Sequence, residues 1–110
     1  MKRKEKSLKE QAMELKGVVN SIIWDYSLPL NTSEFKTLYN IVNYMDQFIL
    51  NCFDDNGKLI HKKWIQKKLI TCVVFLGASS HIELQRVMKL VIDLENSIYL
   101  EEVPTQDERD

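Results

Sequence analysis

The sequence predicts an all-α fold, a single antiparallel bundle of four helices with up-down-up-down topology. Apolar residues recur at alternating steps of three and four through four long segments, which is the period of an amphipathic helix. The chain has only three glycines and two prolines, and both prolines lie outside those segments, which disfavours a sheet with many turns. Its 110 residues are 45% hydrophobic and 28% charged, as in one globular domain.

The first helix is expected at about residues 7–27. Its core stripe has one apolar side chain per turn, at Leu8, Ala12, Leu15, Val19, Ile22 and Tyr26. Pro29 ends this helix, because a proline disfavours the helical conformation of the residue before it and donates no backbone hydrogen bond.

The second helix is expected at about residues 32–53. Asn31 is a favourable N-cap, and Glu34, three residues later, completes a capping box. The core stripe is Phe35, Leu38, Val42, Met45, Ile49 and Cys52, widened by Ile41 and Phe48. The segment 54–57 follows as a turn, because its Asn-Gly pair tolerates positive φ.

The third helix is expected at about residues 59–76, and its two halves differ. The first half is amphipathic and rich in lysine, whereas residues 69–76 are apolar on nearly every side. We therefore expect this second half to be the most buried part of the protein. Its β-branched residues also suit a central strand, but a helix is favoured because the segment continues a helical pattern and lacks a partner strand.

The fourth helix is expected at about residues 81–102. Gly77 is predicted as the residue that follows the third helix, and Ser80 with Glu83 as a capping box that opens the fourth. The core stripe is Leu84, Val87, Val91, Leu94 and Ile98. Pro104 marks the end of the helix, and residues 1–6 and 104–110 are expected to be flexible tails of the single domain 1–110.

Composition narrows the setting of the protein. A net charge of −1 provides no overall attraction to nucleic acid or membrane. The longest apolar run falls far short of the ~20 residues of a spanning helix, and no apolar region follows the basic start as in a signal peptide. We expect a cytoplasmic protein with reduced cysteines. Twelve Lys, ten Ile and seven Asn against two Ala suggest an AT-rich genome, that of a low-GC bacterium, a phage or a plasmid.

Residues with catalytic or metal-binding chemistry are present, but the predicted helices keep them apart. Cys52 and His61 come close where the second helix ends, whereas Cys72 and His81 lie near the other end of the bundle, ~16 Å away. The four are not expected to bind one zinc ion, nor the two cysteines to form a disulfide. The chain also has no glycine-rich phosphate loop and no Glu-x-x-His motif. We therefore predict no enzyme activity, metal, cofactor or small-molecule substrate.

The outer faces of the first two helices predict binding to another protein. Trp24 projects opposite the core stripe, and that side of the first helix carries no charge from Gly17 onward. The outer face of the second helix is polar but almost uncharged. Interface cores are depleted of charge and enriched in Trp, Met and Tyr. The predicted partner-binding residues, with Trp24 as the anchor, are Met13, Gly17, Asn20, Trp24, Asn40, Tyr44 and Gln47.

The leading hypothesis is therefore a non-enzymatic protein–protein interaction protein, such as a small regulator, inhibitor or immunity-type protein. Its partner is expected to be another protein or a second copy in a homodimer. The alternative is a nucleic-acid-binding regulator that uses the lysine-rich stretch 58–68, which contains no acidic residue. The candidate phosphate contacts of that alternative are Lys58, Lys62, Lys63, Lys67 and Lys68.

Overall fold

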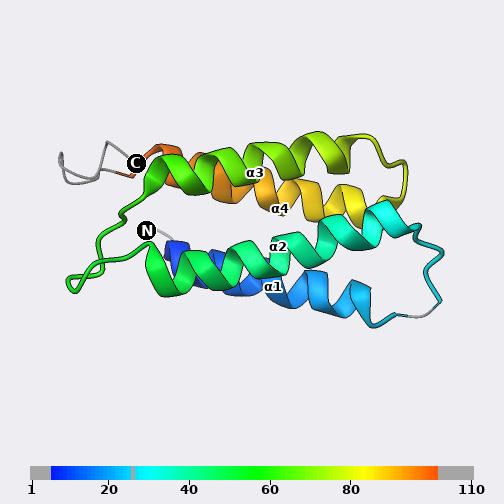
Figure 1. The fold of residues 1–110 in the computed structure, drawn as a ribbon, viewed down its shortest axis with the longest axis horizontal. Coiled ribbons are helices and arrows are strands. Elements are labelled where there is room, and N and C mark those ends of the chain that lie inside the picture. The colour runs from blue at the N-terminus through cyan, green and yellow to red at the C-terminus, as the bar shows by residue number, and fades with distance from the viewer. Residues whose placement is uncertain (1–5, 26, 102–110) are drawn as a thin grey trace, which may run out of the picture.

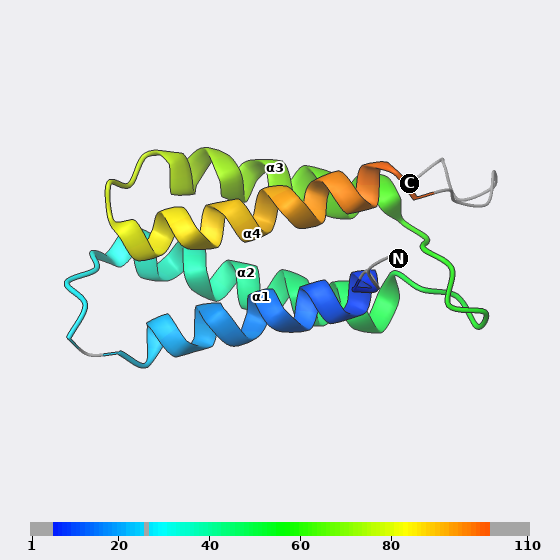
Figure 2. The ribbon, with the colours of Figure 1, turned by 180° about the vertical axis from the view of Figure 1, so that it is seen from behind.

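A computed structural model describes residues 6–25 and 27–101 and confirms the all-α, four-helix prediction. The helices are α1 (Leu8–Ile23), α2 (Thr32–Asn51), α3 (Lys62–Gly77) and α4 (Ile82–Tyr99). Figure 1 shows consecutive helices running in opposite directions, and Figure 2 shows the same arrangement from behind. Each helix contacts two neighbours, so that α1 packs on α2 and α4, and α3 packs on α2 and α4. The diagonal pairs, α1 with α3 and α2 with α4, make no contact.

Each helix contributes one stripe of buried side chains to a shared core. The predicted stripes of the first and fourth helices are buried, except that Tyr26 lies outside the described residues. The stripe of α2 is rotated toward the two residues that were expected only to widen it, Ile41 and Phe48. Phe35, Val42 and Ile49 are consequently only partly buried. The buried apolar residues of α2 and its C-cap are Leu38, Ile41, Met45, Phe48 and Cys52.

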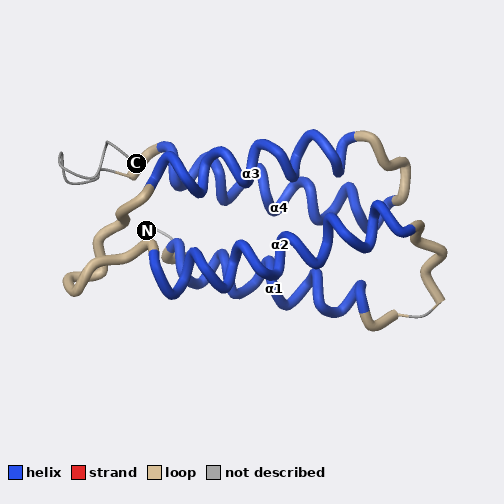
Figure 3. The backbone as a smooth tube through the Cα atoms, viewed as in Figure 1, coloured by secondary structure: helices blue, strands red, loops and turns tan. Residues whose placement is uncertain are grey.

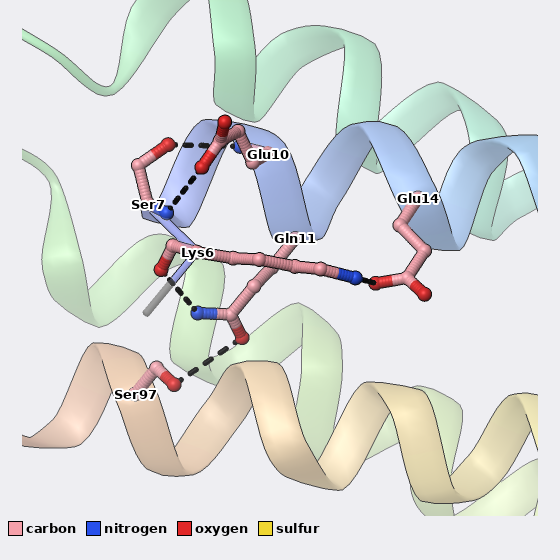
Figure 4. A network of polar contacts seen from close by, with 6 residues as sticks. All are labelled: Lys6, Ser7, Glu10, Gln11, Glu14 and Ser97. Carbon is pink, nitrogen blue, oxygen red and sulfur yellow. Dashed lines mark hydrogen bonds and ion pairs between the residues drawn. The ribbon is translucent and has the colours of Figure 1, made fainter. Parts of the chain in front are cut away.

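The first helix begins with a capping box that the sequence interpretation missed (Figure 4). The Ser7 hydroxyl accepts the Glu10 backbone N–H at 3.1 Å, and the Glu10 carboxylate accepts the Ser7 N–H at 2.8 Å. Two N–H groups that the first turn leaves without helical partners are thus satisfied. One turn later, the Ser97 hydroxyl of α4 donates to the Gln11 side chain at 3.2 Å, which links the two helices.

The first helix ends earlier than predicted, at Ile23, with Trp24 as its C-cap. Beyond it, the Ser27 backbone N–H and hydroxyl both donate to Asp25 Oδ1, at 3.0 and 2.6 Å. These hydrogen bonds lower the pKa of the Asp25 carboxyl. An aspartate that bonds the backbone two residues ahead stabilises a turn in competition with the helix, which accounts for the shorter helix.

Glu34 ties the start of α2 to the loop between α3 and α4. The predicted capping box is confirmed, with Asn31 Oδ1 accepting the Glu34 N–H at 2.8 Å and Glu34 Oε1 accepting the Asn31 N–H at 2.9 Å. The Ser79 hydroxyl donates to the other carboxylate oxygen of Glu34 at 2.7 Å. The hydrogen bonds from Asn31 and Ser79 lower the pKa of Glu34. The Glu34 carboxylate therefore caps α2 and joins the two halves of the bundle, the α1–α2 pair and the α3–α4 pair.

The connection from α2 to α3, residues 52–61, is a loop with a turn near its middle, and it lies at the opposite end of the bundle from the other two loops (Figure 3). Gly57 has a φ of +79°, as expected for the Asn-Gly turn. An isolated antiparallel bridge joins Phe53 to Leu59, and Leu59 is buried. This pairing keeps residues 59–60 extended, so that the third helix begins at Lys62 and not at residue 59. His61 precedes it with a φ of +57°, which is uncommon for a side chain other than glycine.

The start of the fourth helix differs from the prediction. Its N-cap is His81, whose Nδ1 accepts the Glu83 N–H at 3.3 Å, so the predicted Ser80–Glu83 capping box is wrong. Gly77 is the last residue of α3, and Ala78 follows in a right-handed helical conformation. The prediction that Gly77 follows the third helix is therefore also wrong.

The fourth helix ends at Tyr99, three residues before the predicted end. Lys62 Nζ donates to the carbonyl oxygens of Tyr99 and Glu101 at 3.0 and 2.7 Å. The Tyr99 carbonyl is among those that the end of a helix leaves unsatisfied, Glu101 lies just beyond the helix, and a cation there also complements the helix dipole. Pro104 and the expected flexible ends, apart from Lys6, lie outside the described residues.

The second half of α3 is not the most buried part of the protein, which corrects the prediction. Its inner side supplies Leu69, Cys72 and Leu76 to the core. Ile70, Val74 and Phe75 are 50%, 66% and 56% exposed, although they are apolar. The reason is geometric, since α3 has only two neighbours and their contacts do not reach its outer side.

Adjacent truncations in α3 test this orientation. Leu69→Ala is expected to lower the free energy of unfolding by about 2–5 kcal/mol, because it leaves a cavity in the core. Ile70→Ala is expected to cost less than about 1 kcal/mol, because its side chain is half in solvent. Equilibrium urea denaturation measures both, and equal losses would contradict the orientation.

Removal of the hydroxyl that binds Glu34 tests the link between the two halves. Ser79→Ala should raise the pKa of Glu34 toward its ordinary value and lower stability at pH 7 by about 1 kcal/mol. A carboxylate whose pKa is depressed by folding stabilises the fold above its unfolded pKa and loses that contribution as the pH falls through its folded pKa. The stability difference between variant and wild type should therefore shrink in acid. NMR titration of the Glu34 carboxyl gives the pKa, and an unchanged value would show that the hydroxyl does not act on it.

Candidate functional site

The seven predicted partner-binding residues divide between two surfaces. On α1, Met13 and Gly17 are exposed, Met13 by 59%, and Asn20 is partly buried. Trp24 is 67% exposed, although it makes contacts with other residues. The α1 residues thus form an outer stripe that contains two large side chains.

The predicted residues of α2 lie toward α3. The Tyr44 ring meets the Trp64 ring of α3 edge-on, with centroids 6.3 Å apart and planes at 89°. Tyr44 is also about 18 Å along α2 from the end of the bundle where Trp24 lies, at 1.5 Å per residue. Since Tyr44 packs against Trp64 of α3 and lies this far along the bundle, it does not surround Trp24 as expected. The seven residues therefore do not form one surface.

Two cavities lie between α2 and α3, which pack less closely than the other neighbouring pairs. The Trp64 cavity, of about 440 Å³, is lined by Gln47, Asn51, Cys52, His61 and Trp64. The Phe75 cavity, of about 330 Å³, is lined by Ser33, Lys36, Thr37, Asn40, Tyr44, Thr71, Cys72 and Phe75. Because Tyr44 lines one cavity and packs on Trp64, which lines the other, this aromatic pair separates them. Both volumes fall in the range of ~300–1,000 Å³ that is usual for binding pockets.

An exposed apolar strip lies on the outer side of α3. Ile70 and Val74 are one helical turn apart and lie on the same side of the helix, and neither is among the residues that line the two cavities. Phe75 is 56% exposed and lines one cavity. We define the α2–α3 face as Tyr44, Trp64 and Phe75, together with the two cavities.

The charge on the α2–α3 face is positive. No Asp or Glu occurs between Asp55 and Glu83, so α3 contains lysines without any acid. The acids of α2 are engaged elsewhere, since Asp46 forms an ion pair with Lys16 of α1 at 2.6 Å and Glu34 binds Asn31 and Ser79 at the end of the bundle. A ligand on this face therefore meets lysines and neutral side chains.

The five lysines that were predicted to contact phosphate are placed differently from one another. Lys58 lies in the turn before α3 and not on the helix. Lys62 binds the end of α4, and Lys68 Nζ lies 5.4 Å from the centroid of the Tyr44 ring. Lys63 and Lys67 are exposed on α3. The lysine-rich stretch is thus partly used to hold the bundle together.

The cysteines and histidines divide between the two ends of the face, as expected. Cys52 and His61 line the same cavity, whereas Cys72 lines the other. Both cysteines are buried, and neither forms a disulfide. Burial raises the pKa of the Cys72 thiol from 9.0 to about 11, although Lys68 acts in the opposite direction. Within residues 6–25 and 27–101, no three side chains of the His, Cys, Asp and Glu types are grouped for metal binding.

Comparison with known proteins assigns no function to this site, which is therefore interpreted from its geometry. No protein family matches the sequence, and neither the curated proteins nor the solved structures include a significant match. Among the described helices, none combines the length and the apolar character that crossing a bilayer requires.

Sequence reasoning missed the α3 side of this face and the exposed apolar strip of α3. Trp64 was assigned to the amphipathic stripe, and Ile70, Val74 and Phe75 to the interior. A projection of residues 62–77 at 100° per residue could have found them, because it places Ile70 and Val74 opposite or beside the stripe that contains Leu69. Their apolar character concealed this, since hydropathy alone does not say which apolar side of a helix is covered.

The thiol of Cys72 should react slowly in the folded protein. Alkylation requires the thiolate, and a pKa of about 11 in place of 9.0 lowers its fraction at pH 8 by about 100-fold. Iodoacetamide labelling followed by peptide mapping should show this difference between native and urea-unfolded chain. The native rate should rise with pH to about pH 11, whereas a plateau near pH 9 would contradict the raised pKa.

Proposed function

We propose that this chain is a non-enzymatic protein–protein interaction protein and that its α2–α3 face binds the partner. The observation that carries the proposal is the exposed Phe75 ring and the Tyr44–Trp64 pair beside two cavities. Contiguous exposed apolar surface on a small protein commonly marks a binding site.

The composition of the face supports a protein partner. Tyr44 and Trp64 are side chains that interfaces favour, and Asn40 and Gln47 provide hydrogen-bonding groups without charge. Anchors of a partner bind best in preformed pockets that exclude water, and the two cavities have suitable volumes. Catalysis by the Cys72 thiol, which lines the Phe75 cavity, is disfavoured, because burial keeps this thiol protonated at neutral pH.

The proposal includes a biological setting. A small binding protein of this kind acts as a regulator, an inhibitor or an immunity-type protein in the cytoplasm, where its two cysteines stay reduced. The codon-related bias toward Lys, Ile and Asn suits an origin in a low-GC bacterium, a phage or a plasmid.

Self-association through α1 is a second form of the proposed function. Trp24 and Met13 are both more than half exposed on the outer stripe of this helix. A two-fold dimer would bury the same stripe of each copy. Because Trp24 and the α2–α3 face lie apart, a dimer through α1 would leave that face open to another partner.

Nucleic-acid binding is the alternative, and α3 is the helix that favours it. Lys63 and Lys67 are exposed there, and the helix contains no acid. Lysine contacts with phosphate make affinity fall steeply with salt. The engagement of Lys62 and Lys68 with other parts of the bundle reduces the charge that remains for phosphate.

Affinity capture with matched variants tests the proposed function. The immobilised chain is exposed to nuclease-treated extract of the organism that encodes it, and retained proteins are quantified by mass spectrometry. Phe75→Ser should reduce retention of the partner at least about tenfold, as loss of an interface anchor does. Met13→Ser, an equally exposed change on α1, is the control and should leave retention unchanged.

Two results would contradict the proposal. A partner that is lost with Met13→Ser but kept by the α3 variant would place binding on α1. Retention that depends on nucleic acid, and disappears with Lys63→Glu and Lys67→Glu, would favour the alternative.

A further inference from the structure

The spacing of the two cavities restricts the shape of what can fill both. Along α3, the Trp64 cavity borders residues 61–64 and the Phe75 cavity borders residues 71–75. Their centres are therefore about ten residues apart, or about 15 Å at 1.5 Å per residue. In an α-helix, side chains at positions i and i+11 share one side and lie ~16 Å apart. One helix along this face would thus place an apolar side chain in each cavity.

A helix also suits the walls of the cavities better than an extended segment does. Both walls are helices, α2 and α3, whose backbone groups bond within each helix. An extended segment would find no sheet edge here for its own N–H and C=O groups. A helix satisfies those groups internally, so that only its side chains need partners.

The charge of the face selects the charge of that helix. Lys63 and Lys67 are exposed on α3, Lys36 lines the Phe75 cavity, and Lys68 lies over the Tyr44 ring between the two cavities. No acid of α2 or α3 offsets them, for the reasons given above. An incoming segment that carries carboxylates beside its apolar stripe complements this pattern.

We propose that the α2–α3 face binds an acidic amphipathic helix of a partner protein, which packs along α2 and α3 as a fifth helix. One apolar anchor fills the Trp64 cavity, and a second, eleven residues away, fills the Phe75 cavity and packs on the Phe75 ring. Carboxylates of the partner lie against Lys36 and Lys67. This inference rests on the proposed function and adds the chemistry of the partner.

A second copy of this chain fits the face less well. Two-fold symmetry places the same patch of each copy against itself, which brings the lysines of one α3 toward those of the other. The outer side of α4, the other candidate, mixes Arg86 and Lys89 with its acids. No described helix of the chain therefore presents an acidic stripe to the face.

The test is selection from a displayed library of helical peptides in which all outer positions are randomised, with the full chain as bait. Selected peptides should be acidic and should have apolar residues at i, i+4, i+7 and i+11. The Phe75→Ser variant should bind them at least about tenfold more weakly. Selected peptides that are neutral or basic, or the absence of any selected peptide, would overturn the inference.

Charge reversal provides the matched control. Lys36→Glu with Lys67→Glu should weaken binding of the selected acidic peptides about tenfold at low salt and shift a new selection toward basic helices. Lys89→Glu, on the outer side of α4, should change neither result. Equal losses from Lys67→Glu and Lys89→Glu would indicate only a general charge effect and would overturn the proposed register.

The outcomes separate this inference from the proposed function. If capture from extract depends on Phe75 but the selected peptides show no acidic bias, the face binds a protein of other chemistry and only the inference fails. If single-stranded DNA displaces the selected peptides and binds the Phe75→Ser variant equally well, the face is a phosphate-binding surface and both fail. A dimer in sedimentation that Phe75→Ser abolishes would assign the face to a second copy.

Discussion

Each helix of this bundle can give only one stripe to the core, and α3 carries more apolar side chains than its stripe accommodates. Ile65, Leu69, Cys72 and Leu76 fill that stripe. The remaining apolar residues of the second half, including Val74, face outward because α3 contacts only α2 and α4. The same constraint positions the aromatic pair and the two cavities on the side toward α2. The candidate site is thus a consequence of how a four-helix bundle distributes an excess of apolar residues.

The hydrogen bonds at the helix ends keep this arrangement in register. Glu34 joins the start of α2 to the loop that follows α3, through Ser79. At the other end, Lys62 holds the end of α4 against the start of α3. A polar contact near each end therefore orients α3, and the α2–α3 face between them is built mainly from side-chain packing. None of the ion pairs described above lies on the α2–α3 face, so its lysines are available to a partner.

The fold could be predicted because periodicity reports which residues a helix shares with its neighbours. The stripe from Leu84 to Ile98 needs no tertiary information, and neither does the capping box of Asn31. The site could not be predicted in the same way. The burial of Val74 depends on the number of neighbouring helices that α3 has. A β-branched apolar residue has the same hydropathy whether it is buried or exposed, so hydropathy does not distinguish the two. Tyr44 was recognised as a binding residue from its outer position, but its partner Trp64 follows only from how α2 and α3 pack.

The two tryptophans allow the most direct test, because they mark the two competing surfaces. Trp64 lies in the α2–α3 face and Trp24 on the outer stripe of α1. In a protein labelled with ¹⁵N at tryptophan, addition of the bound partner should shift the indole N–H resonance of Trp64 and leave that of Trp24 in place. A shift of Trp24 alone would contradict the account, because binding would then occur on α1 and the α2–α3 face would have no part in it.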